Sequence, residues 1–203
     1  MTDQTTRDRI LQIASGLFME SGYASTSTRM IAKAAEITQP NLYYHFPNKE
    51  NLYVEACRYL SVSVYQHLRE IVLEDDRLDP EEYSERLIAF RGKLLAMSRY
   101  LAEDLNIDLP LMAHNLRMHL SEEVAEELRD IWEEACLKPF IELFDEYKAI
   151  MTKEIPQERL MIFFLTFLTA FMNLGKIQSQ SLTLEESLNI FIRSCIDPVY
   201  LLG

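Results

Sequence analysis

The residues TRMIAKAAEITQPNLYYHFPNK, numbered 28–49, decide how this chain folds. They follow the run ASTST at 24–28, and Ser and Thr are favoured N-cap residues of helices. A helix of two turns over residues 29–35 is therefore predicted. A tight turn over residues 36–38 follows it, with Ile37 as the apolar residue of the turn.

A second short helix is predicted directly after this turn. Thr38 is its cap, and Pro40 stands in its first turn, where the missing N–H of a proline has no cost. Pro47 ends it, because the residue before a proline disfavours the helical region. Two short helices that are joined by a tight turn and rest on a longer first helix form a helix-turn-helix.

The faces of the second short helix differ in chemistry. Leu42 and Phe46 are four residues apart and share an inward face. The other faces carry Gln39, Pro40, Asn41, Tyr43, Tyr44 and His45. This set suits a helix that lies in the DNA major groove, where amides read adenine edges and tyrosine hydroxyls reach phosphates. Taken singly, Tyr44 and His45 equally fit the surface of a helical hairpin, and only the joint pattern favours DNA binding.

A longer helix is predicted before this motif. Its apolar residues have the 3.6-residue period of one helix face: Ile10, Ile13, Ala14, Leu17 and Phe18. Thr5 or Thr6 is its N-cap, and Gly22 gives it a left-handed stop.

The chain after the motif is also helical in pattern. A long helix begins at Lys49 and fades near Asp75-Asp76. Further helices are predicted at about 80–103, 107–119, 122–149, 157–178 and 183–196. No stretch shows the two-residue alternation of a strand, so the prediction is an all-α protein.

Composition and charge exclude several classes of protein. The sequence is 48% hydrophobic and 26% charged, which is typical of a globular chain with a core. Its three cysteines form no CxxC pair, so we expect neither structural disulfides nor a metal site, and a reducing cytoplasm. The longest apolar run, residues 160–174, is too short for a membrane span, and no membrane association is expected.

The net charge of −12 is unevenly distributed. Residues 1–50 hold five basic and five acidic side chains, so the whole excess of acid lies in residues 51–203. A neutral head on an acidic body suggests two modules with different partners, although an ordinary acidic surface would give the same numbers.

Residues 7–60 resemble the N-terminal domain of the TetR family of transcriptional repressors. The resemblance is carried by Ile10-Leu11-x-x-Ala14-x-x-Leu17-Phe18, Gly22-Tyr23, Ser27-Thr28-Arg29-x-Ile31-Ala32-x-x-Ala35 and Leu42-Tyr-Tyr-His-Phe46-Pro-Asn-Lys49-Glu-x-Leu52. It implies a three-helix DNA-binding domain at 1–50, with its helix-turn-helix at about 29–48, and a helical ligand-binding and dimerisation domain at 51–203.

The resemblance also implies which residues contact DNA. Thr28, Arg29, Tyr43 and Lys49 correspond to backbone contacts, and Arg29 also to a base contact. The groove readers are Gln39, Pro40, Asn41, Tyr44 and His45. The sequence departs from the family at Glu36, where members usually have glycine. Because glutamate tolerates a left-handed conformation less well, this turn is predicted to be strained.

One helix-turn-helix reads few bases, so a homodimer on a pseudo-palindromic double-stranded DNA operator is expected. The stretch 160–174 is apolar on nearly every side, and the pattern continues in the final helix with Leu188, Ile190, Phe191, Ile192 and Cys195. The resemblance therefore implies dimerisation through the last two helices, about 157–196. The alternative is a monomer with a buried central helix.

The second domain is expected to bind an unidentified small-molecule effector. Aromatic and Met side chains suit an apolar ligand site, although at helical spacing they are more often core. The candidates are Phe90, Met97, Tyr100, Met112, His114, Trp132, Phe164, Phe167 and Phe171. In the family mechanism, an effector shifts the helix over 50–73 and changes the separation of the two reading heads, for which one DNA turn is about 34–36 Å.

The two alternative functions for an all-α chain of this kind are catalysis and a helical ligand-binding or scaffold role. Catalysis is not expected, because no histidine follows a glutamate at the Glu-x-x-His spacing and the sequence has no nucleotide-binding or hydrolase motif. No cofactor is expected either. The remaining alternative is a helical ligand-binding or scaffold protein that keeps the helix-turn-helix only as structure. These patterns do not encode the operator, the regulated genes or the effector. They also do not distinguish a repressor from an activator, or an inducer from a corepressor.

Overall fold

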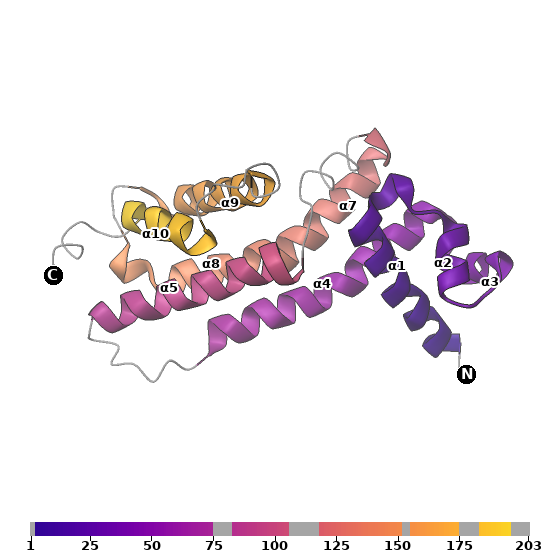
Figure 1. The fold of residues 1–203 in the computed structure, drawn as a ribbon, viewed down its shortest axis with the longest axis horizontal. Coiled ribbons are helices and arrows are strands. Elements are labelled where there is room, and N and C mark those ends of the chain that lie inside the picture. The colour runs from indigo at the N-terminus through magenta and orange to yellow at the C-terminus, as the bar shows by residue number, and fades with distance from the viewer. Residues whose placement is uncertain (1–2, 75–82, 106–117, 152–154, 175–182, 196–203) are drawn as a thin grey trace. The chain divides into compact units, whose positions relative to one another are not determined.

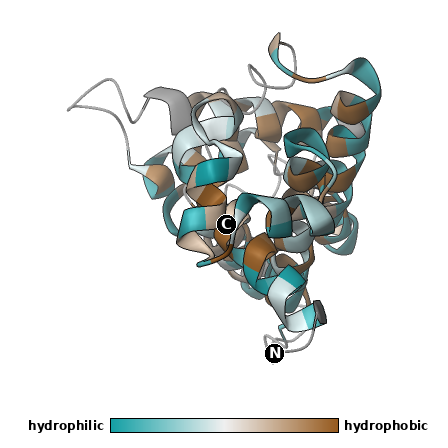
Figure 2. Ribbon diagram, turned by 90° about the vertical axis from the view of Figure 1, so that its right-hand side faces the viewer, coloured by the Kyte–Doolittle hydropathy of each residue, from teal (hydrophilic) through white to brown (hydrophobic). Residues whose placement is uncertain are grey.

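The structure, a computed structural model, describes residues 3–74, 83–105, 118–151, 155–174 and 183–195. Its main helices are α1 (Asp3–Ser25), α2 (Thr28–Ala34), α3 (Gln39–His45), α4 (Lys49–Leu73), α5 (Tyr83–Arg99), α7 (Glu122–Trp132), α8 (Lys138–Glu146), α9 (Gln157–Leu174) and α10 (Leu184–Cys195) (Figure 1). Brown apolar and teal polar segments alternate along individual helices, as amphipathic helices require (Figure 2). The all-α prediction is confirmed.

Three short segments interrupt or extend these helices. The π-helix η1 (Tyr100–Asp104) continues α5, and the π-helix η2 (Glu133–Leu137) joins α7 to α8. The 3₁₀ turn η3 (Lys148–Ile150) follows α8. The single helix expected at 122–149 is thus divided, and most of the helix expected at 107–119 lies outside the described residues.

The chain packs as two compact units. The first comprises Met1–Gln66 and Asp108–Cys136, and the second comprises His67–Ile107 and Leu137–Gly203. The chain passes between them three times: within α4, between residues 107 and 108, and within η2 between Cys136 and Leu137. These are packing units; the functional division after residue 50 stays a prediction.

The first unit is built around one apolar core. It joins the inward faces of α1, α2, α3 and α4, and it also takes in Leu128 and Ile131 of α7. Gly22 has φ 76° and ψ 166°, which interrupts the run of helix in α1. The buried Thr26 follows this break, and its single hydroxyl proton is shared between the Gly22 and Leu17 carbonyls, whose oxygens lie 2.9 and 3.1 Å from the hydroxyl oxygen. Glycine is needed at this position because other residues rarely adopt these angles.

The second unit has an aromatic core. The rings of Phe144, Phe164 and Phe191 contact one another, with centroids 5.2–6.3 Å apart. Phe90 joins them through Phe144, 5.5 Å away, and Phe140 joins through Phe164, 5.0 Å away. Residues from α5, α8, α9 and α10 therefore meet in one cluster.

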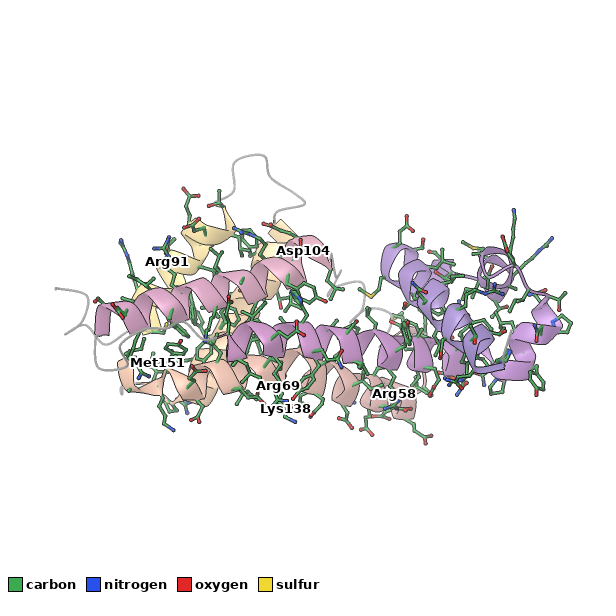
Figure 3. The ribbon with its side chains drawn as sticks, turned by 90° about the horizontal axis from the view of Figure 1, so that it is seen from below. Arg58, Arg69, Arg91, Asp104, Lys138 and Met151 are labelled. Carbon is green, nitrogen blue, oxygen red and sulfur yellow. The ribbon has the colours of Figure 1, made fainter. Side chains whose placement is uncertain are left out.

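Ion pairs connect helices at the surface of each unit (Figure 3). In the first unit Arg58 of α4 pairs with Glu127 of α7. In the second, Arg91 of α5 pairs with Glu185 of α10. These side chains are about half exposed, so each pair contributes little to stability. No helix among the described residues has the length and apolarity needed to cross a membrane.

The turn between α2 and α3 closes as a Schellman motif. The Ile37 N–H donates to the Ala32 carbonyl at 3.0 Å, and the Glu36 N–H donates to the Lys33 carbonyl at 3.2 Å. This pattern requires a left-handed residue between the helix and Ile37, and Glu36 has φ 53°. Ile37 packs against the core, as the sequence predicts for the apolar residue of the turn.

Replacing Glu36 with glycine is expected to raise the free energy of unfolding by about 1 kcal/mol. A residue with a Cβ pays a penalty of about 1–2 kcal/mol in the left-handed region, and glycine removes this penalty. Part of the gain is lost because glycine gives the unfolded chain more conformational freedom. Urea unfolding followed by circular dichroism measures the change. Glu36→Ala is the matched control, because alanine keeps the Cβ and gains nothing. An equal gain from both variants would show that charge, not backbone strain, is responsible.

Candidate nucleic-acid interface

The candidate interface is formed by α2 and α3, whose starts are fixed by capping side chains. The Ser27 hydroxyl accepts a hydrogen bond from the Met30 N–H at 3.2 Å. The Thr38 hydroxyl accepts from the Asn41 N–H at 3.3 Å. These caps satisfy backbone donors that would otherwise lack partners. Pro40 lies in the first turn of α3, as predicted.

The two sides of α3 have opposite environments. Leu42 and Phe46 are fully buried in the core of the first unit. Tyr44, on the opposite side, keeps 75% of its surface exposed, and Pro40 one turn earlier is also exposed. A helix held by two apolar residues and exposing a large aromatic ring suits insertion into a groove.

One flank of α3 is tied to the start of α2. The Tyr43 and Thr28 hydroxyl oxygens lie 3.1 Å apart and share a hydrogen bond. The Gln39 amide nitrogen donates to the same Thr28 oxygen at 3.5 Å. Gln39 and Tyr43 are four residues apart, so they occupy one row along the helix.

The other flank of α3 carries Asn41 and His45. Asn41 is exposed, and His45 is half-buried, with its ring 5.2 Å from the ring of Tyr44 and 6.3 Å from that of Phe46. All six α3 residues predicted to face the groove therefore lie on one short helix, and five of them are exposed.

Lys49 lies at the start of α4, after the Asn48 cap, and its ammonium nitrogen is 4.2 Å from the centre of the Tyr23 ring. Burial lowers the pKa of Lys49. The pKa of Tyr23 is raised by burial and then by the nearby Glu50 carboxylate. A lysine held over an aromatic ring keeps its charge in a fixed place.

The cations near this surface are few. Arg29 and Lys33 are exposed on α2. Arg7 of α1 is engaged otherwise: it pairs with Glu55 of α4, and its guanidinium lies 5.2 Å from the centre of the Phe46 ring. Glu55 also faces Arg58 at 3.9 Å. Arg7 therefore supports the underside of α3, and its charge is partly neutralised.

Helix α7 was expected from the sequence as a helix, but its place in the core of this unit was not. Leu128 and Ile131 complete the core beneath α1 and α4, and Leu120 and Val124 pack against it. Glu50 accepts a hydrogen bond from the Ser121 N–H at 3.0 Å. The apolar period of residues 124–132 predicts an amphipathic helix, but it carries no signal for which core the helix joins.

The residues proposed for an effector site have varied surroundings. Phe90, Met97 and Phe164 are fully buried, and Phe167 and Phe171 are half-buried. Tyr100 is half-buried in η1, with its ring 4.1 Å from that of His67. Met112 and His114 lie outside the described residues.

Trp132 differs from the other candidates, because it belongs to the first unit. It is 8% exposed, and its indole nitrogen has no hydrogen-bond partner among the described residues. Buried indole N–H groups usually find an acceptor.

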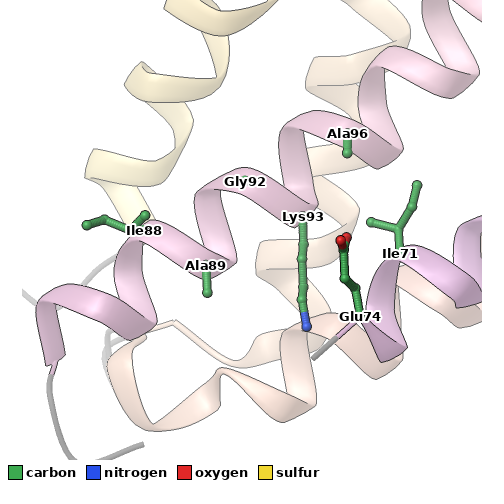
Figure 4. Close-up of a pocket in the computed structure, with 7 residues that line it drawn as sticks. All are labelled: Ile71, Glu74, Ile88, Ala89, Gly92, Lys93 and Ala96. Atoms are coloured by element: carbon green, nitrogen blue, oxygen red, sulfur yellow. The ribbon is translucent and has the colours of Figure 1, made fainter. Parts of the chain in front are cut away.

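The second unit has an open groove between α4 and α5 (Figure 4). Its volume is about 290 Å³, and its lining residues are Ile71, Glu74, Ile88, Ala89, Gly92, Lys93 and Ala96. The buried Lys93 ammonium donates to the Val72 carbonyl at 2.8 Å and lies 3.8 Å from Glu146. Lys93 thereby neutralises the carboxyl end of α4.

No group of three His, Cys, Asp or Glu side chains among the described residues is placed to hold a metal ion. Burial raises the pKa of Cys57, Cys136 and Cys195 to about 12 each, so these thiols are protonated and poorly nucleophilic at neutral pH.

Comparison with known proteins identifies the helix-turn-helix. Residues 10–56 match the family of bacterial regulatory proteins described as the tetR family. The HTH-type transcriptional regulator QacR of Staphylococcus aureus is 49% identical over 49 residues, which is 24% of this chain and 26% of that protein. This similarity is thus confined to about a quarter of each chain.

Two further similarities extend over most of the chain. The Staphylococcus aureus biofilm operon icaADBC HTH-type negative transcriptional regulator IcaR is 26% identical over 77% of this chain and 79% of its own. The reduced form of Escherichia coli NemR has the same fold, with a TM-score of 0.74, 16% identity and coverage of 95% of this chain and 98% of the NemR chain.

Proposed function

We propose that this chain, which belongs to the TetR family and is a DNA-binding transcriptional regulator, represses its target genes until a small-molecule effector releases it from the operator. The observation that carries the proposal is the exposure pattern of α3. Leu42 and the cap residue Phe46 are buried, and polar and aromatic side chains are exposed on the other faces of the helix. Regulators of this family are not enzymes, so the chemistry is one of recognition.

The proposed contacts follow from the exposure of each side chain. Gln39, Pro40, Asn41, Tyr44 and His45 read base edges from α3, where amide and aromatic groups meet adenine edges and thymine methyls. Arg29, Tyr43 and Lys49 bind phosphates around them, and Arg29 also reaches a base. Thr28 is buried and joins this phosphate-binding flank through its contact with Tyr43. The few cations are supplemented by the backbone N–H groups at the starts of α2 and α4.

Repression is supported by the likeness to IcaR, whose name describes a negative transcriptional regulator. A protein that covers an operator blocks transcription by occupying the DNA. Such a regulator acts in the cytoplasm, where the bacterial chromosome is found, and we propose this location for the chain.

We propose a homodimer through α9 and α10, within residues 157–196. Ile162 and Phe163 of α9 and Ile190 of α10 are 61%, 55% and 59% exposed. Exposed apolar residues on adjacent helices mark an interaction surface. Dimerisation would place two copies of α3 on a pseudo-palindrome with half-sites about 34–36 Å apart.

The Ile190→Glu variant is expected to convert the dimer to a monomer, because a charge would be buried without a partner in the interface. Size-exclusion chromatography with light scattering measures the mass. Ile88→Glu is the matched control, since Ile88 is 68% exposed on α5, outside this surface. A dimer that survives Ile190→Glu would contradict the proposed interface.

We propose that the effector binds in the second unit, where Phe90, Met97, Phe164 and their neighbours supply an apolar environment. A shift of α4 would then transmit binding to the head, because α4 begins at Lys49 and continues into the second unit. The remaining candidates in the second unit are Tyr100, Phe167 and Phe171. Trp132 lies in the first unit, and Met112 and His114 lie outside the described residues.

The experiment that tests this function is selection of bound duplexes from a random DNA pool at two salt concentrations. A two-fold-related motif enriched at both concentrations is expected. The same protein sample is analysed by mass spectrometry for a co-purified small molecule. Failure to enrich any motif with protein free of bound molecules would favour the scaffold alternative.

A further inference from the structure

We propose that Thr28 is a positioning residue that directs the hydroxyl proton of Tyr43 toward a DNA phosphate. The inference rests on the proposed function and deepens it, because it assigns a hydrogen-bond order to the phosphate-binding flank of α3. The observation that carries it is the 3.1 Å contact between the two hydroxyl oxygens.

The two partners differ in burial. Thr28 is the first residue of α2 and is 9% exposed, so its side chain is held by the surrounding protein. Tyr43 is 45% exposed and reaches out from α3. The contact therefore holds an exposed tyrosine against a buried threonine. It joins the start of α2 to α3, whereas the strained Glu36 turn connects the end of α2 to α3.

The hydrogen bond from Gln39 favours one direction for the shared bond. Each hydroxyl has one proton to donate and two lone pairs that accept, so either oxygen could donate across the 3.1 Å contact. The Gln39 amide donates to the Thr28 oxygen at 3.5 Å, which polarises the Thr28 hydroxyl and makes its proton the better donor toward the Tyr43 oxygen. Tyr43 then keeps its own proton for an outside acceptor.

The outside acceptor that fits this arrangement is a phosphate oxygen. A Tyr43 hydroxyl that donated to Thr28 would present only lone pairs to DNA and would repel a phosphate. In the proposed order, Gln39 donates to Thr28, Thr28 donates to Tyr43, and Tyr43 donates to the phosphate. Each of these hydrogen bonds polarises the next one. Holding the hydroxyl in place before binding also reduces the ordering entropy lost on association.

The test is a double-mutant cycle on the full-length protein. Thr28→Val keeps the shape and removes the hydroxyl, and Tyr43→Phe removes the phenolic group. Binding is measured with the duplex enriched by selection and with a scrambled duplex of equal length. Each single variant is expected to weaken binding about three- to tenfold, and the double variant no more than Tyr43→Phe alone.

Further readouts separate positioning from a general loss of structure. Thr28→Ser restores the hydroxyl and is expected to restore affinity. Because a phosphate contact carries no sequence information, the loss is the same on both duplexes. The slope of affinity against salt is unchanged by either neutral substitution, whereas Lys49→Ala lowers it by about one. Thermal melting confirms that each variant is folded.

Additive effects of Thr28→Val and Tyr43→Phe would overturn the inference, since Thr28 would then act independently of Tyr43. Full affinity in Tyr43→Phe, with binding lost in Tyr44→Ala, would overturn it while leaving the DNA surface intact. Full affinity in Tyr44→Ala and Lys49→Ala as well would instead reject the whole proposed surface.

Discussion

Tyr44→Ala is expected to weaken operator binding by about 1–3 kcal/mol per half-site, which is roughly five- to 150-fold for each copy of α3. Tyr44 is 75% exposed on the side of α3 that lies opposite the buried Leu42 and Phe46. Its ring would be buried against base edges on binding, and alanine would leave that area unfilled. Fluorescence anisotropy with the enriched duplex measures the affinity.

Tyr59→Ala is the matched control for this substitution. Tyr59 is 42% exposed and belongs to the first unit, but it lies in α4 and outside the proposed contacts. Its loss is expected to leave operator affinity unchanged. Equal affinities for the Tyr44 and Tyr59 variants would show that α3 does not enter the groove.

Leu128→Ala is expected to lower the stability of the DNA-binding head by about 2–5 kcal/mol, although Leu128 is far from α1–α4 in sequence. Leu128 is 1% exposed within the core that holds α1, α2 and α3. Removing its side chain leaves a cavity beneath helices that must be rigid to read DNA. Hydrogen exchange measures the loss as reduced protection of α1–α3.

Leu73→Ala is the control here, because Leu73 is 67% exposed on α4. A change within about 0.5 kcal/mol is expected from it. If Leu128→Ala reduced protection only within α7, the helix would be an attachment to the head and not part of its core.

The fold and the buried and exposed sides of α3 were predictable where local signals decide the structure. Thr38, Pro40 and Pro47 mark the ends of α3, and Leu42 and Phe46 mark its buried side, because capping and periodicity act over a few residues. The positive φ at Glu36 confirms the strain predicted for that turn.

The remaining features depend on contacts between distant parts of the chain. No pattern in residues 122–132 shows that Leu128 joins the core with Ile10, and nothing near Arg7 shows that it pairs with Glu55. The π-helix η2 also gave no signal, because Ile131, Trp132 and Ala135 keep an ordinary helical spacing in the sequence at this point. Ring contacts such as Phe90 with Phe144 are likewise set by tertiary packing.

The inclusion of α7 in the first unit has a consequence for how such regulators exchange parts. A recombination event, or a designed chimera, that transplants residues 1–50 onto another effector domain would separate the head from Leu128 and Ile131. The new host must then supply matching side chains at those places or leave a gap under the transplanted helices. A head of this kind is therefore inherited together with the second half of α7, and a working graft carries both segments.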